Sequence, residues 1–111
     1  MTPANRLLPL CDTADVPVDE GLQVAVDDFV VAVFKIGDRY CVIDDQCTHG
    51  PGLLSEGDVD GEIVECNFHH GAFNIRTGEV AAPPCMVPIR TYHVEVRDGR
   101  IYIDTERPAE P

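Results

Sequence analysis

Two short segments of this chain combine the residue types that bind transition metals. Residues 47–49 read Cys-Thr-His and residues 66–69 read Cys-Asn-Phe-His, with sixteen residues between the two segments. Each segment is short enough for one loop to present a thiolate and an imidazole to the same metal. Glycine and proline are concentrated around both, and a long irregular insertion in a small domain usually has a functional reason. The candidate ligands are Cys47, His49, Cys66 and His69.

This Cys2His2 pattern has three possible interpretations: chance, a zinc site or an iron–sulfur cluster. They differ in the order and spacing of cysteines and histidines that they predict. Chance is disfavoured, because a cysteine–histidine pair occurs twice in glycine-rich surroundings. Zinc accepts the same four ligands, but they usually come as a cysteine pair followed by a histidine pair. In a Rieske [2Fe-2S] cluster, two histidines replace two cysteines on one iron. Each segment here mixes the two ligand types, which favours the iron–sulfur cluster and leaves a zinc-bound interaction module as the alternative.

In order and spacing, these motifs resemble the Rieske-type ferredoxin family. The similarity runs from about Leu7 to Ile103 and includes Gly71, Gly78 and the prolines at 83 and 84. It implies an all-β fold, a small antiparallel three-sheet (ISP-like) structure. Two loops of that fold form the cluster-binding subdomain, and a third loop that contains proline lies beside them.

The resemblance also implies the role of each ligand in one [2Fe-2S] cluster. Cys47 and Cys66 would bind the inner iron, and His49 and His69 would bind the outer, more exposed iron. His70 follows a ligand directly and is a competing candidate. The Cys-x-x-His spacing favours His69, which leaves His70 at the rim of the cluster.

Three further cysteines have no place in this ligand set. Cys41 lies in an apolar segment and is expected in the core. Cys11 has no motif around it, and Cys85 follows two prolines in the loop expected beside the cluster, where packing is favoured over ligation. Five cysteines without a recognisable export signal indicate reduced thiols in a cytoplasmic protein.

Respiratory Rieske proteins contain four features whose positions can be compared with this sequence. They add one cysteine to each cluster loop and join the two in a disulfide; Gly52 and Phe68 occupy those positions here. They also place a serine and a tyrosine hydroxyl near the cluster sulfurs, where this chain has Gly71 and Phe73. Without these donors, the midpoint potential is expected near the low end of the Rieske range, which is roughly −150 to +300 mV.

The rest of the sequence predicts antiparallel strands. Valine and isoleucine number 21, against 6 leucines and 8 alanines, and β-branched residues suit pleated sheets. Apolar segments end at the turn dipeptides Gly37-Asp38 and Asp98-Gly99, which predict two hairpins. We expect a single domain over residues 1–111, with a basal β part at about 5–44 and 86–104. The cluster-binding insertion would span about 45–85, and residues 105–111 would form a loose tail.

Length and charge exclude several classes of function. A chain of 111 residues suffices for one domain, and its net charge of −12 disfavours binding to nucleic acid and to anionic membranes. The longest apolar run, residues 29–34, is far shorter than the roughly 20 residues of a membrane span. The charge favours a basic protein partner.

The resemblance implies a soluble electron carrier of bacterial ring-hydroxylating oxygenase systems. A flavin-dependent NADH reductase would supply single electrons, and a terminal non-haem iron oxygenase would receive them to hydroxylate an aromatic substrate. The chain itself would be the electron-carrier component of that system and would not be an enzyme. The alternative within the same fold is the small subunit of an assimilatory nitrite reductase.

Overall fold

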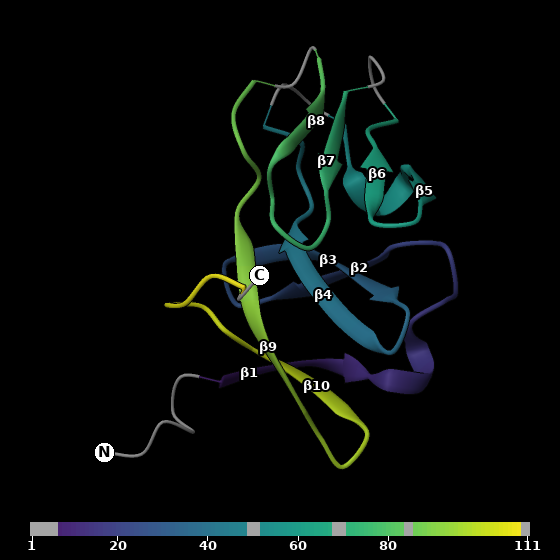
Figure 1. The fold of residues 1–111 in the computed structure, drawn as a ribbon. Helices are drawn as coiled ribbons and strands as arrows, with labels where there is room; N and C mark the ends of the chain where they lie inside the picture. The colour runs from purple at the N-terminus through teal and green to yellow at the C-terminus, as the bar shows by residue number, and fades with distance from the viewer. Residues whose placement is uncertain (1–6, 49–51, 68–70, 84–85, 110–111) are drawn as a thin grey trace.

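The computed structural model describes residues 7–48, 52–67, 71–83 and 86–109. These residues form ten β-strands and two 3-10 helices, without an α-helix (Figure 1). The strands are β1 (Leu7–Asp12), β2 (Leu22–Val26), β3 (Phe29–Ile36), β4 (Arg39–Asp44), β5 (Asp58–Asp60), β6 (Ile63–Glu65), β7 (Ala72–Asn74), β8 (Val80–Ala82), β9 (Thr91–Arg97) and β10 (Arg100–Asp104). The 3-10 helices are η2 (Thr13–Asp15) and η3 (Leu54–Glu56). No helix in these ranges is long and apolar enough to cross a membrane.

The strands pair in two antiparallel sheets. The larger has the order β1-β10-β9-β4-β3-β2, and the smaller has the order β5-β6-β7-β8. Only two residue pairs, Val42 with Tyr92 and Ile43 with Thr91, join β4 to β9. The larger sheet therefore consists of two three-stranded halves, which together with the smaller sheet correspond to the three sheets of the predicted fold. The all-β, antiparallel prediction is confirmed.

Both predicted hairpins are present. Gly37 has φ +61° in the turn between β3 and β4, where Ile36 pairs with Arg39. Asp98 and Gly99 have φ +52° and +77° in the turn between β9 and β10. Two successive residues with positive φ match the twist of the flanking strands, which is why an Asp-Gly dipeptide favours this connection.

β3 lies between two hydrophobic cores. Val31 and Val33 face the core enclosed by the two halves of the larger sheet, whereas Ala32 and Phe34 face the core beneath the smaller sheet. All four side chains are at most 1% exposed. Successive side chains of a strand point to opposite faces, so burial of both faces explains why this segment is apolar without alternation.

The C-terminal segment is attached to β9 over residues 105–109, which differs from the loose tail expected there. Three hydrogen bonds make the attachment: Arg90 Nη2 to the Thr105 carbonyl at 2.6 Å, the His93 N–H to the Arg107 carbonyl at 3.0 Å, and the Ala109 N–H to Thr91 Oγ1 at 3.0 Å. Composition alone suggested mobility, because these residues are polar and contain proline. The groups that hold them are the Arg90 and Thr91 side chains and the His93 N–H, which lie more than ten residues earlier in the chain.

Candidate metal centre

The first candidate loop follows β4 and closes on itself. The Cys47 backbone N–H donates to the Gly52 carbonyl at 2.8 Å, and Gln46 forms an isolated antiparallel bridge with Leu53. These contacts bring residues 46–47 next to residues 52–53, with Cys47 at the base of the loop. Gly52 occupies the position at which respiratory Rieske proteins have a disulfide-bonded cysteine. Here its carbonyl accepts the hydrogen bond that closes the loop.

The second candidate loop connects β6 to β7 and closes in the same way. The Cys66 backbone N–H donates to the Gly71 carbonyl at 2.6 Å. In both loops the amide of a cysteine therefore bonds to the carbonyl of a glycine five residues later. The two cysteines occupy equivalent places, at the start of two loops with the same closing hydrogen bond.

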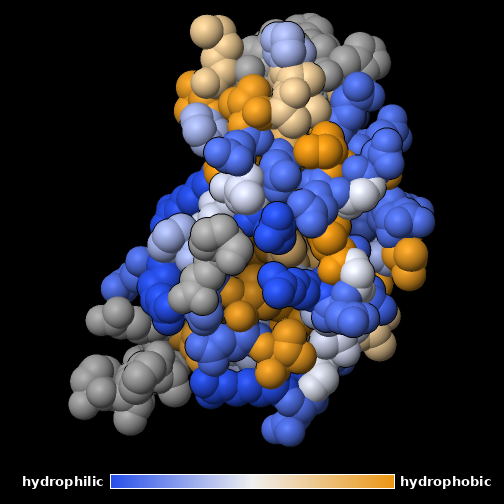
Figure 2. Space-filling model, in the orientation of Figure 1, coloured by the Kyte–Doolittle hydropathy of each residue, from blue (hydrophilic) through white to orange (hydrophobic). Residues whose placement is uncertain are grey.

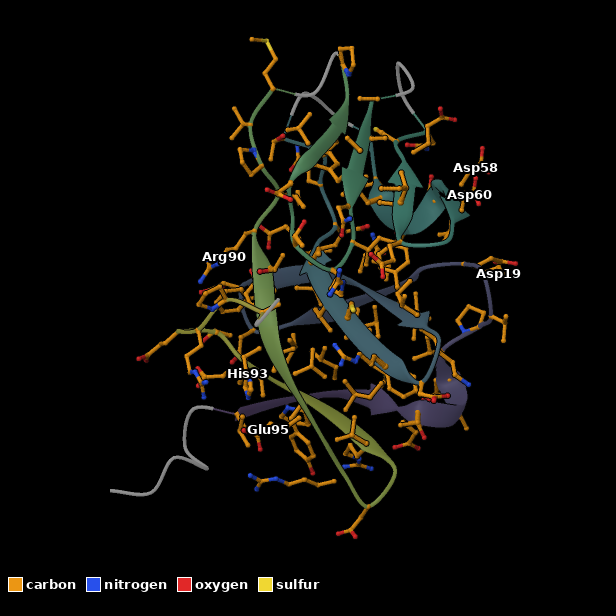
Figure 3. All side chains as sticks on the ribbon, viewed as in Figure 1. Asp19, Asp58, Asp60, Arg90, His93 and Glu95 are labelled. Carbon is orange, nitrogen blue, oxygen red and sulfur yellow. The ribbon has the colours of Figure 1, made fainter. Side chains whose placement is uncertain are left out.

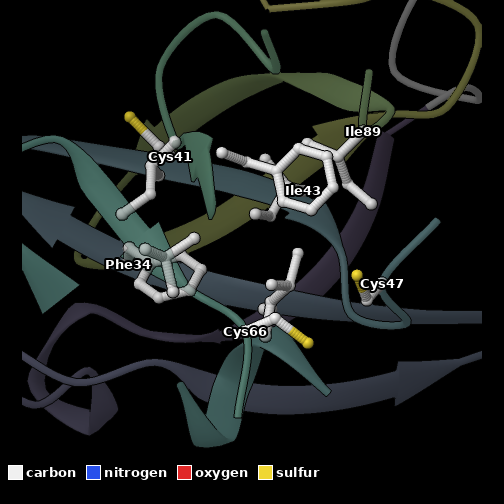
Figure 4. Close-up of a cluster of buried hydrophobic side chains, with 11 residues drawn as sticks. Phe34, Cys41, Ile43, Cys47, Cys66 and Ile89 are labelled. Carbon is white, nitrogen blue, oxygen red and sulfur yellow. The ribbon is translucent and has the colours of Figure 1, made fainter. Parts of the chain in front are cut away.

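The two cysteines lie in one apolar cluster beneath these loops. Cys47 is 3% exposed and Cys66 is 1% exposed, and both belong to the core that contains Ile43 and Ile89. Figure 4 shows them near each other at one end of this core, with Cys41 toward the other end. A buried thiolate needs a compensating positive charge, which a metal ion supplies. Paired buried thiols at the bases of two loops therefore fit the inner ligands of an iron–sulfur cluster.

Part of the predicted ligand set lies outside the described residues. His49 and His69 fall in the ranges 49–51 and 68–70, as does the competing candidate His70, and Cys85 falls at 84–85. Within the described ranges, no group of three or more His, Cys, Asp or Glu side chains is arranged to hold a metal ion. The structure thus brings together the two predicted cysteines, and both histidines stay predictions.

Two of the remaining cysteines have environments that favour the neutral thiol. Burial is the main reason that the pKa of Cys41 is raised, with Arg39 partly opposing it. Burial also raises the pKa of Cys11, and the neighbouring carboxylates of Asp15 and Asp12 add to the effect. Cys41 is 9% exposed and belongs to the core, as predicted.

Thr48 connects the first loop to the third, proline-containing segment. Its Oγ1 donates to the Val87 carbonyl at 2.7 Å. Met86 and Val87 are 86% and 59% exposed, so this segment presents apolar side chains beside the first loop. Figure 2 shows apolar colours at this end of the molecule, above a face that is largely hydrophilic. Sequence reasoning assigned no role to Thr48, because a threonine inside a metal motif gives no signal of its own.

Asp45 anchors the base of the first loop and was also missed from sequence. It is 0% exposed, and its carboxylate accepts hydrogen bonds from Gln23 Nε2 at 2.6 Å and from the Ser55 N–H at 2.8 Å. Its own carbonyl accepts the Leu54 N–H at 2.7 Å. The only sequence signal was an aspartate directly after Asp44, the last residue of β4, and a solvent-exposed turn could contain the same pair of residues.

A tyrosine next to this anchor is held in its neutral form. The Tyr92 hydroxyl donates to Asp44 Oδ1 at 2.5 Å, and Tyr92 is 1% exposed. Burial first, and then the Asp44 carboxylate, raise the pKa of this hydroxyl well above its ordinary value. The hydrogen bond couples the end of β4, where the first loop begins, to β9.

Phe73 and Gly71 provide no side-chain hydroxyl, as the sequence indicated. Phe73 is 0% exposed and packs in the same core as both buried cysteines. The Gly71 carbonyl is engaged by the Cys66 amide. Phe73→Tyr would therefore introduce a hydroxyl into the core that contains both cysteines.

Residues 6–93 match the Rieske [2Fe-2S] domain. This chain belongs to the Rieske family. Its relatives include ferredoxin CarAc of Metapseudomonas resinovorans, which is 47% identical over 77 residues, or 69% of this chain and 72% of the relative. The biphenyl dioxygenase ferredoxin subunit of Pseudomonas sp. (strain KKS102) is 40% identical over 100 residues, or 89% and 92% of the two chains.

A solved Rieske structure shows the same fold. It belongs to a complex of reduced oxygenase and oxidised ferredoxin in carbazole 1,9a-dioxygenase, and the match has a TM-score of 0.85 at 40% identity. The alignment covers 95% of this chain and 98% of that chain. Two of the relatives are named as the ferredoxin subunit of biphenyl dioxygenase and the ferredoxin component of the p-cumate 2,3-dioxygenase system, which are electron carriers and not the catalytic enzymes.

Proposed function

We propose that this protein is a ferredoxin that transfers single electrons through one Rieske [2Fe-2S] cluster. Cys47 and Cys66 would hold the inner iron, and His49 and His69 the outer iron. The observation that supports this most is the pair of buried cysteines at equivalent positions in two identically closed loops. The bound cluster supplies a one-electron redox couple, and neutral imidazoles in place of two thiolates make it easier to reduce.

The domain arrangement follows from the same features. We infer one domain over residues 1–111, in which residues 5–44 and 86–104 form the base and residues 45–85 form the cluster-binding part. The two hydrophobic cores support this division, because one lies within the larger sheet and the other lies between β3, β4 and the smaller sheet.

The proposed partners are a flavin-dependent NADH reductase and a terminal non-haem iron oxygenase in the cytoplasm. The oxygenase is supported by the names of the relatives and by the solved complex of an oxygenase with a ferredoxin. The relatives favour this role over the nitrite reductase subunit and the zinc-bound module. The reductase follows from the need to reload a carrier with electrons.

Metal analysis and electron paramagnetic resonance test the proposal directly. The purified protein should be reddish-brown, contain iron and acid-labile sulfide in equal amounts, and show the low average g-value of a mixed His/Cys cluster when reduced. One zinc per chain without iron would instead support the interaction module.

Association with either partner should weaken as salt is added. Net charge of −12 favours steering by basic surfaces, and the Debye length falls from about 10 Å at 0.1 M salt to about 3 Å at 1 M. The transfer rate should therefore fall about tenfold or more across that range. Stopped-flow measurement of electron transfer to the oxygenase gives this rate.

Two sets of charge variants localise the effect. Asp58 and Asp60 are exposed on β5 and lie on one flank of the molecule together with Asp19 (Figure 3). The double variant Asp58→Asn/Asp60→Asn should reduce the salt dependence, whereas Asp98→Asn, in the distant β9–β10 turn, is the control. A rate independent of salt would show that the acidity serves solubility alone.

The midpoint potential is expected near the low end of the Rieske range and should rise when a hydroxyl is added. Phe73→Tyr would place a donor in the core that contains both cysteines, and Gly71→Ser would place one at the end of the second loop. A hydrogen bond to sulfur stabilises the reduced, more negative state. We expect an upward shift of about 60 mV, the equivalent of one tenfold change for one electron. Protein-film voltammetry measures it, and a high wild-type potential would contradict the prediction.

A further inference from the structure

The two cysteines share a core, but the closing hydrogen bonds of the two cluster loops do not themselves connect one loop to the other. The first loop extends from β4 of the larger sheet, and the second connects β6 to β7 of the smaller sheet. The hydrogen bonds from Cys47 to Gly52 and from Cys66 to Gly71 each lie within one loop. A cluster that takes one cysteine from each loop needs a contact between the loops to fix the two thiolates relative to each other.

Asn67 makes such a contact with both polar atoms of its amide. Its Oδ1 accepts the Leu53 backbone N–H at 3.1 Å, and its Nδ2 donates to Glu56 Oε1 at 3.1 Å. Leu53 ends the first loop, and Glu56 ends η3, which follows it. The side chain has few rotatable bonds, so two simultaneous hydrogen bonds leave it little freedom.

The segment that Asn67 contacts is itself fixed to the base of the first loop. Asp45 holds the backbone N–H groups of Leu54 and Ser55 through its carbonyl and its carboxylate. The Glu56 N–H donates to the Leu53 carbonyl at 3.1 Å. Because Asn67 directly follows Cys66, its two bonds tie the second cysteine to the same anchor that precedes Cys47.

We propose that Asn67 is a positioning residue that sets the placement of the Cys66 loop against the Cys47 loop and thereby keeps the cluster in one geometry. The inference rests on the proposed function, because it assumes that both cysteines bind one cluster. Asn67 is exposed, so changing it removes no core packing. Loss of its contacts should therefore act on the loops and leave the fold intact.

A charge-matched pair of substitutions tests this role. In Asn67→Asp the oxygen that faces Leu53 remains, but a carboxylate now faces Glu56 and the contact becomes repulsive. In the double variant Glu56→Gln/Asn67→Asp, the glutamine amide can donate to the new aspartate carboxylate. The direction of the hydrogen bond is then reversed, and the total charge equals that of the wild type. Asn74→Asp is the control, since it adds a charge to the smaller sheet while keeping the oxygen that accepts from the Arg76 and Thr77 N–H groups.

The measurements are the linewidths of the reduced cluster in electron paramagnetic resonance and the rate at which a chelator removes iron. Asn67→Asp should broaden the lines, because the cluster samples several geometries, and should release iron about fivefold faster, the effect of one ordinary hydrogen bond. The double variant and Asn74→Asp should stay within about twofold of the wild type.

Each contrary result is distinguishable. If Asn67→Asp matches the wild type in both measurements, or if the double variant is as impaired as Asn67→Asp, the contact does not position the loops. Equal impairment of Asn74→Asp would assign the effect to added charge and would also overturn the proposal. Absence of a cluster from the wild type would instead refute the proposed function.

Discussion

Alanine in place of Cys47 or Cys66 should reduce the iron content of the purified protein to background. Each substitution removes a proposed inner ligand that is buried in the core beneath the loops, where water does not replace a thiolate. We expect the same loss for His49→Ala and His69→Ala. Iron and sulfide analysis, together with the visible absorption of the cluster, measures the outcome.

The other cysteines provide matched controls for this experiment. Cys11→Ala and Cys41→Ala should keep the cluster, because burial holds both thiols in the neutral form and neither lies in a cluster loop. Cys85→Ala should also keep it, since four ligands complete the site. Retention of a full cluster in Cys47→Ala, or its loss in Cys85→Ala, would contradict the assigned ligand set.

Asp45→Ala should destabilise the protein by about 1–3 kcal/mol and also weaken cluster retention. The substitution leaves the Ser55 N–H without its acceptor, and an unsatisfied buried group costs about 1–3 kcal/mol. It also removes the hydrogen bond from Gln23, which is exposed and can donate to water instead. Because Asp45 lies two residues before Cys47, the loop loses its anchor as well. Urea unfolding of the cluster-loaded protein measures the first effect, and iron release measures the second.

Asp45→Asn separates the hydrogen bonds from the charge. Asparagine keeps an oxygen for the Ser55 N–H, and the Gln23 amide can rotate to present its own oxygen to the new Nδ2. This variant should lose less than half of the free energy lost by Asp45→Ala. Equal destabilisation of the two variants would show that the charge, and not the hydrogen-bonded anchor, is what stabilises this region.

The sequence predicted the parts of the structure that depend on local patterns. The Asp98-Gly99 turn was predictable because its backbone conformation requires those residue types. The two cysteine loops were predictable because the ligand spacing is specific to one kind of cluster. β3 was recognisable as a strand from its apolar residues. The burial of both its faces depends on the packing of the two sheets around it, which the sequence does not show.

Contacts between distant segments could not be read from the sequence. Asp45 and Asn67 resemble ordinary polar loop residues. Asp45 bonds to Gln23, 22 positions away, and Asn67 bonds to Leu53, 14 positions away. In the attachment of residues 105–109, that segment contributes only backbone groups, which have no residue-type signature. The same applies to the bond from Thr48 to the Val87 carbonyl.

The double-sided burial of β3 makes the base and the cluster-binding part a single cooperative unit. Val33 and Phe34 are adjacent in the chain yet belong to different cores, so any displacement of β3 disrupts both cores at once. An excised 45–85 fragment would lack one wall of its core and should not fold alone. Conversely, a ligand bound only to the native loops stabilises the whole chain by mass action. A cluster bound at the proposed ligands would therefore protect the base from proteolysis as well as the loops.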